Sequence, residues 1–154
     1  MKLPRRIEPN LKTRALGYLA RREHSRLELE RKLEPHAQTS EELSSLLDTL
    51  EQRGFLSAAR MVEQVIHMRK NRFGSQRIAH ELREKGIAEN LIAEALPNIR
   101  EAERESAREV WRKKFGAMPA DAKELARQMR FLRGRGFAAE AIHQVLRHPD
   151  KEEV

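Results

Sequence analysis

The sequence contains no cysteine among its 154 residues, and this absence excludes several kinds of site. A chain without thiols has no disulfide framework, no thiolate ligand for zinc and no cysteine nucleophile, and it fits a reducing compartment. No apolar run approaches the roughly 20 residues that are needed to span a bilayer. The composition therefore predicts a cytoplasmic protein with no membrane segment.

Aromatic residues are scarce, at 5% of the chain, and strand signals are missing. Alternating runs of β-branched residues do not occur, whereas the helix formers Ala, Leu, Glu, Arg and Lys dominate. With so few large rings, thin layers between helices are more plausible than one large core. The predicted fold class is all-α.

The spacing of apolar residues and helix breakers predicts nine helices. Ser25 with Glu28, and Thr39 with Glu42, have the pattern of a capping box at the start of a helix. Pro97 is expected to end a short helix, because the residue before a proline avoids the helical conformation. We therefore expect separate helices on the two sides of Pro97.

The nine helices group into three similar sets of three. A helical unit this small cannot bury its apolar face alone, so such units stack on their neighbours. The expected architecture is a curved, elongated array of three tandem three-helix repeats. Its predicted segments are a flexible basic N-terminal segment (1–10), repeat 1 (11–56), repeat 2 (57–98), repeat 3 (99–148) and an acidic tail (149–154).

No combination of residues in the sequence indicates catalysis. The six histidines lack the spacing of a zinc site, and no glycine-rich phosphate loop or nucleophile motif occurs. Trp111 shares a helical stripe with Ala107 and Phe115, which favours core packing over base stacking. We expect no enzymatic activity, no cofactor, no metal ion and no small-molecule substrate.

The charge of the chain is the more informative feature. The formal net charge is +7, and residues 1–77 carry 16 basic and 10 acidic side chains. An excess of positive charge attracts polyanions. The alternative interpretation of each basic cluster is a solvated surface that keeps the protein soluble.

A cationic stripe is predicted on the helix that begins at Asp121. Its members recur at i, i+4 and i+7 and so share one face: Lys123, Arg127 and Arg130. The opposite face should pack inward through Leu125, Met129 and Leu132. Because residues 127–135 include no acid, we expect the stripe to lack a neutralising partner and to bind.

Two further basic clusters are candidates for binding. One surrounds Gly74 and Ser75, where a helix N-terminus would present free N–H groups to an anion. The other lies beside Ser25, where Glu23 and Glu28 could neutralise it in part. The candidate binding residues are Arg21, Arg22, Arg26, Lys32, Arg69, Lys70, Arg72, Arg77, Lys123, Arg127, Arg130, Arg133 and Arg135.

Several motifs stand in a characteristic order along the chain. They are Leu19-Ala20-Arg21-Arg22-Glu23-His24-Ser25, Gly54-Phe55-Leu56, Phe73-Gly74, Glu81-Leu82-Arg83-Glu84-Lys85-Gly86-Ile87, Lys114-Phe115 and Arg135-Gly136-Phe137. In this order the sequence resembles the RecX family of recombination regulators, over residues 11–147. One departure is Ser57-Ala58-Ala59, which stands where the family usually has a pair of aspartates.

The resemblance implies a function in DNA recombination, DNA repair and the SOS response. RecX proteins are arrays of three-helix repeats that bind the RecA recombinase, lodge in the groove of the RecA–DNA filament and restrain its growth, ATP hydrolysis, strand exchange and coprotease activity. We therefore expect RecA filaments as the partner, with weak, phosphate-directed and salt-sensitive contact to DNA. The alternative is a basic helix-turn-helix-like transcription factor that acts on DNA without RecA, although its short helices offer few side chains for base edges.

Overall fold

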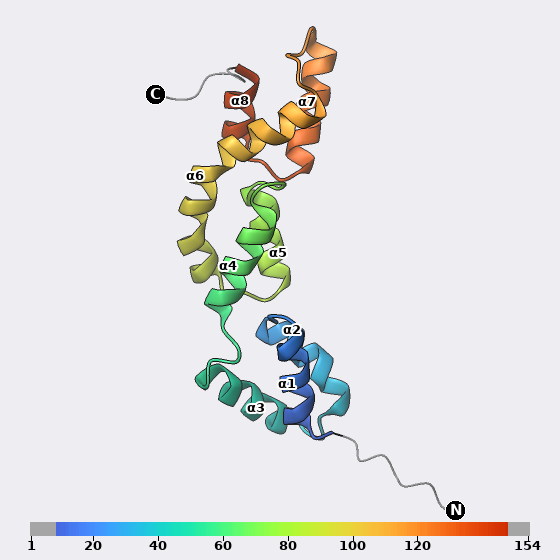
Figure 1. The fold of residues 1–154 in the computed structure, drawn as a ribbon, viewed down its shortest axis with the longest axis vertical. Helices are drawn as coiled ribbons and strands as arrows, with labels where there is room; N and C mark the ends of the chain where they lie inside the picture. The colour runs from blue at the N-terminus through green and yellow to red at the C-terminus, as the bar shows by residue number, and fades with distance from the viewer. Residues whose placement is uncertain (1–8, 148–154) are drawn as a thin grey trace, which may run out of the picture. The chain divides into compact units, whose positions relative to one another are not determined.

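Every regular element of this chain is helical over residues 9–147, the part that the computed structural model describes. In chain order the elements are α1 (Leu11–Arg21), α2 (Arg26–Leu33), the 3₁₀ helix η1 (Glu34–His36), α3 (Ser40–Gln52), α4 (Ala58–Arg69), α5 (Ser75–Glu84), α6 (Glu89–Lys114), α7 (Ala122–Gly134) and α8 (Ala139–Arg147) (Figure 1). The all-α prediction is confirmed. The predicted acidic tail at 149–154, and all but the last two residues of the predicted N-terminal segment at 1–10, lie outside the described residues.

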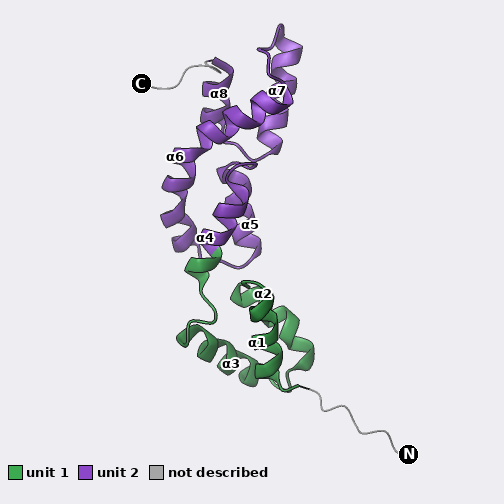
Figure 2. Cartoon of the chain, in the orientation of Figure 1, with its two compact units in different colours: residues 1–61 green, residues 62–154 purple. Residues whose placement is uncertain are grey.

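The chain divides into two compact units, residues 1–61 and residues 62–154 (Figure 2). Helix α4 begins in the first unit and continues in the second. The division into three repeats with the boundaries given above, and the curvature of the array, stay predictions.

The first unit is held together by leucines. Its buried core consists of Leu11, Ala15, Leu29, Leu33, Leu43, Leu47, Leu50 and Leu56. The capping box at Ser25 forms as predicted, since the hydroxyl accepts from the N–H of Glu28 and the Glu28 carboxylate accepts from the N–H of Ser25. At Thr39 only half of the box forms, because the carboxylate of Glu42 accepts from the N–H of Gln38 instead.

Helix α6 corrects one prediction about the helices. Pro97 does not end a helix but lies inside this single helix of 26 residues, so the described residues hold eight α-helices where nine helices were predicted. Pro97 is exposed, whereas Ile92 and Ile99 on either side of it are buried. Packing of both halves therefore outweighs the lost hydrogen bond, and α6 changes direction along its length (Figure 1).

Helix α6 is the central element of the second unit. It packs against α5, α7 and α8. One core of this unit consists of Ala107, Trp111, Leu132, Phe137, Ile142, Val145 and Leu146. Trp111 is buried, and its indole N–H donates to the side-chain oxygen of the buried Gln128 at 2.8 Å. The prediction that Trp111 packs in the core is confirmed.

Candidate nucleic-acid interface

Three half-buried phenylalanine rings of the second unit each lie against basic side chains. We call this set the cation–aromatic row, and it consists of Phe73, Phe115 and Phe131 with Arg69, Arg77, Lys114, Arg127 and Arg135. A guanidinium or ammonium group within about 6 Å of a ring centroid is attracted by the negative face of the ring. The row therefore holds several cations in defined positions.

Arg135 links two rings of the row. Its guanidinium carbon lies 5.4 Å from the centroid of Phe73 and 5.4 Å from that of Phe131. Phe131 meets Phe115 edge to face, with centroids 5.4 Å apart. The cluster predicted around Gly74 and Arg127 of the stripe predicted on α7 are thus parts of one surface. The four arginines of the row are among the candidate binding residues predicted from the sequence, whereas Lys114 and the three rings are not.

Two glycines bring these segments into contact. The N–H of Gly74 donates to the carbonyl of Arg135 at 2.9 Å, and the N–H of Gln76 donates to the carbonyl of Gly136 at 3.0 Å. A Cβ atom at Gly74 would lie 2.4 Å from the carbonyl oxygen of Gly136. Only glycine allows this approach, which places Arg77 and Arg135 beside Phe73.

The helix N-terminus at Gly74 and Ser75 was predicted to present free N–H groups to an anion. This prediction is wrong, because the N–H groups at the start of α5 are already bonded within the protein. The N–H of Ser75 donates to the buried carboxylate of Glu103 at 3.0 Å, and its hydroxyl donates to the same carboxylate. The N–H groups of Gly74 and Gln76 are taken by the α7–α8 loop. This helix terminus is satisfied within the protein, because Glu103 supplies the negative charge that a helix N-terminus favours.

The stripe on α7 is only partly as predicted. Glu124, which precedes the acid-free stretch, accepts two hydrogen bonds from the Arg127 guanidinium at 2.9 and 3.0 Å. These bonds, followed by one from Gln128, lower the pKa of the Glu124 carboxyl. Arg127 is therefore neutralised in place.

The inward face of α7 also differs from the prediction. Leu125 is 38% exposed, whereas Gln128 and Leu132 are buried. Gln128 takes the inward position because the indole of Trp111 needs an acceptor there, and its own amide N–H donates to the carbonyl of Ala117 at 3.1 Å.

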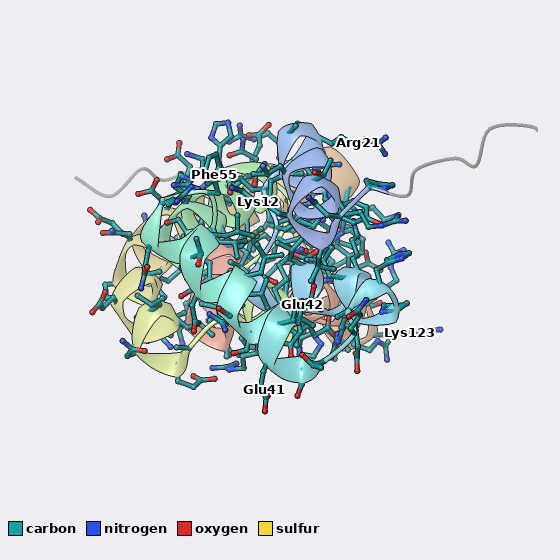
Figure 3. The ribbon with its side chains drawn as sticks, turned by 90° about the horizontal axis from the view of Figure 1, so that it is seen from below. Lys12, Arg21, Glu41, Glu42, Phe55 and Lys123 are labelled. Carbon is teal, nitrogen blue, oxygen red and sulfur yellow. The ribbon has the colours of Figure 1, made fainter. Side chains whose placement is uncertain are left out.

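Several candidate cations of the second unit have no carboxylate partner within the described part of the chain. They are Lys70, Arg72, Arg77, Lys123, Arg130, Arg133 and Arg135. Arg69 differs, because its Nε atom donates to Glu81 at 3.0 Å. Figure 3 shows Lys123 projecting away from the ribbon.

The cluster of the first unit is largely paired. Arg26 bonds Asp48 at 2.6 Å and Glu51 at 3.1 Å. Arg22 pairs with Glu28, as the sequence suggested, at 3.3 Å. These contacts reduce the charge that the cluster offers to a partner.

The other two candidates of the first unit differ from each other. Lys32 donates to the buried ring of His24 at 2.8 Å and lies 4.9 Å from the ring of Tyr18. Arg21 is exposed and has no carboxylate partner among the described residues (Figure 3). Glu23, predicted to neutralise this cluster, pairs instead with Arg60.

Among residues 9–147, no group of three or more histidine, aspartate or glutamate side chains is placed to hold a metal ion. Within the same residues no helix is long and apolar enough to cross a membrane.

Two family models match most of the second unit. The model described as the second three-helix domain of RecX matches residues 59–96, and the model described as the third three-helix domain of RecX matches residues 101–146. The chain is also 53% identical over 147 residues to the regulatory protein RecX of Leptothrix cholodnii, a match that covers 96% of this chain and 94% of that protein. It is 42% identical over 152 residues to the regulatory protein RecX of Ralstonia pickettii, with 98% and 94% covered.

Solved structures share the fold. The crystal structure of RecX from Lactobacillus salivarius superimposes with a TM-score of 0.81 at 21% identity and covers 91% of this chain and 94% of that chain. A second crystal structure of a regulatory protein RecX has a TM-score of 0.75 and covers 88% of this chain and 70% of that chain.

Proposed function

Because this chain belongs to the RecX family of regulatory proteins, we propose that it binds the RecA–DNA filament and inhibits filament extension, ATP hydrolysis, strand exchange and coprotease activity. The observation that carries this proposal is the similarity to regulatory proteins named RecX, which extends over nearly the whole chain. The protein acts in the cytoplasm by binding and performs no chemistry on its partner.

The cation–aromatic row supports an anionic partner. Stacking on a ring restricts a guanidinium group without using its N–H donors, so less entropy is lost when those donors bind an anion. A filament of RecA on DNA offers phosphates beside protein surface, and phosphates attract such a row over a distance of about one Debye length. Contact of this kind is weak, directed at phosphates and sensitive to salt.

The test is the ATPase activity of RecA on single-stranded DNA with this protein added in increasing ratio. We expect the rate of ATP hydrolysis to fall as the protein titrates the filament. Unchanged hydrolysis at every ratio, with binding to the filament also absent, would reject the proposal. Tight sequence-specific binding to duplex DNA without RecA would favour a transcription factor instead.

A further inference from the structure

The four arginines of the cation–aromatic row fall into two classes. Arg69 and Arg127 each hold a carboxylate, Glu81 at 3.0 Å and Glu124 at 2.9 Å. Arg77 and Arg135 have no carboxylate partner among residues 9–147, and the guanidinium group of Arg135 donates to the carbonyl of Arg72 at 3.5 Å. The row therefore combines two neutralised guanidinium groups with two that keep a full charge.

The two charged guanidinium groups share one ring. The guanidinium carbon of Arg77 lies 4.8 Å from the centroid of Phe73, and that of Arg135 lies 5.4 Å from it. Their backbones are fixed to each other by the hydrogen bonds between the Gly74 and Gly136 segments. Arg69 also lies over this ring, at 6.0 Å, and is paired with Glu81, whereas Arg77 and Arg135 bring two positive charges to the ring without a carboxylate of their own. Their shared position therefore indicates a site that receives an anion.

We propose that Arg77 and Arg135, held by Phe73, form the main phosphate-binding site of this chain and take the backbone of a single-stranded nucleic acid. Glu81 and Glu124 act as internal anions that withhold Arg69 and Arg127 from the same strand. This inference rests on the nucleic-acid contact of the proposed function and assigns it to named residues. Phe73 is a positioning residue that orients both guanidinium groups.

A single strand fits the row better than a duplex or an acidic protein. Its phosphates alternate with unstacked bases, and a base can stack on the outer face of a guanidinium plane that already lies on a ring. The row likewise alternates charges with flat apolar groups. A duplex presents its phosphates but keeps its bases stacked, and an acidic peptide offers carboxylates without bases.

The test measures binding of a fluorescent oligothymidylate to the full chain, without RecA, by anisotropy over a range of sodium chloride concentrations. Each of R77A and R135A should weaken binding by about tenfold and reduce the slope of log K against log salt by about 0.7, the value for one phosphate contact in a single strand. R69A and R127A are the matched controls, because each removes one stacked arginine that is already paired. Both controls should change affinity by less than about twofold.

Variants of the acids and of the ring test the rest of the inference. E81Q and E124Q should tighten binding several-fold and increase the salt slope, because each releases a guanidinium group. F73L should weaken binding without changing the slope, since the phosphate contacts remain but are held less firmly. Thermal unfolding of each variant shows whether it is folded.

Several outcomes would overturn the inference. The first is that the wild-type chain does not bind the oligonucleotide at low salt. The second is that R77A and R135A bind it as tightly as the wild type does. The third is that the controls R69A and R127A lose as much affinity as R77A and R135A. Equal affinity for duplex DNA would reject the single-strand assignment, and competition by polyglutamate at equal charge would assign the site to acidic protein. The ATPase assay separates the two proposals: if the wild-type chain inhibits RecA while R77A and R135A bind the oligonucleotide like the wild type, the proposed function stands and the phosphate site is rejected.

Discussion

The hydroxyl of Ser75 donates its single proton to the carboxylate of Glu103, whose two oxygens lie 2.9 and 3.0 Å from the Ser75 Oγ atom. One of these oxygens also accepts from the backbone N–H of Ser75 at 3.0 Å and from that of Ala138 at 2.8 Å. Ser75 is the first residue of α5, and Ala138 directly precedes α8. A single buried side chain of α6 therefore caps two helices that are far apart in sequence and adjoin the cation–aromatic row.

Replacing Glu103 should destabilise the second unit. Glu103→Ala leaves the buried N–H group of Ser75 and the half-buried N–H group of Ala138 without an acceptor, and we expect the free energy of unfolding to fall by about 3 kcal/mol. Glu101→Ala is the matched control, since Glu101 is exposed on the same helix and should change stability by less than about 0.5 kcal/mol. Urea denaturation followed by circular dichroism measures both. Equal losses in the two variants would contradict the role of Glu103 as a shared cap.

Two glycines at the end of α7 should respond to alanine with opposite signs. Gly136 has φ of +84°, and a Cβ atom there would lie 2.3 Å from Cβ of Arg77, so Gly136→Ala should cost at least about 2 kcal/mol. At Gly134, in the last position of α7, an added Cβ meets nothing within 4 Å. Gly134→Ala should therefore raise the free energy of unfolding by up to about 1 kcal/mol. Thermal unfolding compares the two variants, and a gain in stability for Gly136→Ala would show that the two loops do not meet this closely.

His24 should make stability depend on pH. Burial lowers the pKa of its imidazole, against a hydrogen bond to the carbonyl of Arg22 that raises it. The neutral ring accepts from Lys32, a bond that is lost when the ring is protonated. Between the lowered pKa and about 6.5, the value in the unfolded chain, the unfolded state binds more protons.

The free energy of unfolding should therefore decrease as pH falls from about 7 through the folded-state pKa of His24 and then stop responding to this group. His24→Asn, which keeps a donor toward Arg22, should flatten the curve below about pH 7. His36→Asn, at an exposed position, is the control and should retain the wild-type slope. Identical slopes for wild type and His24→Asn would remove His24 from this explanation.

The bond between Trp111 and Gln128 can be measured with a double-mutant cycle. Gln128→Leu leaves the indole N–H buried and unpaired, and should cost about 1–3 kcal/mol. Adding Trp111→Phe removes the unpaired donor, so the double variant should lose less than the sum of the single variants. Urea denaturation of the four proteins gives the coupling energy. A coupling near zero would show that Gln128 is buried for its volume alone.

Charge reversal on α7 should weaken binding to the filament without unfolding the chain. The variant carries Lys123→Glu, Arg127→Glu and Arg130→Glu, and the control carries Lys12→Glu, Arg31→Glu and Arg53→Glu. Both change the net charge equally, but only the first alters the predicted stripe. We expect the first to bind RecA filaments about tenfold more weakly and the control to bind within about threefold of wild type. Unchanged affinity of the α7 variant would remove the stripe from the interface.

The starts and ends of helices were readable from sequence because they depend on neighbouring residues. Ser25 caps α2 through Glu28, and Asp121 caps α7 through the N–H of Glu124. Gly54 follows α3 with φ of +78°. Each of these features satisfies backbone groups within a few residues of itself.

The position of Pro97 inside α6 could not be predicted from neighbouring residues. By its local effect a proline ends a helix. Here Ile92 and Ile99, on either side of Pro97, are buried and hold the two halves of α6 against the rest of the second unit. Gln128 is a second case, since its burial depends on the N–H of Trp111, 17 residues earlier. Both outcomes follow from contacts across the fold that outweigh propensity.

The sequence by itself determined the helical class, most helix limits, the family and the positions of the basic residues. These follow from local conformational preference and from motif order. Only the tertiary structure decided which cations are neutralised and which remain charged. Arg69 and Arg127 are held by Glu81 and Glu124, whereas Arg77 and Arg135 meet over Phe73. The physical reason is that a charge acts on whatever lies within a few ångströms of it, and residues as distant in sequence as Arg77 and Arg135 become neighbours only when two glycine turns bring their backbones into contact.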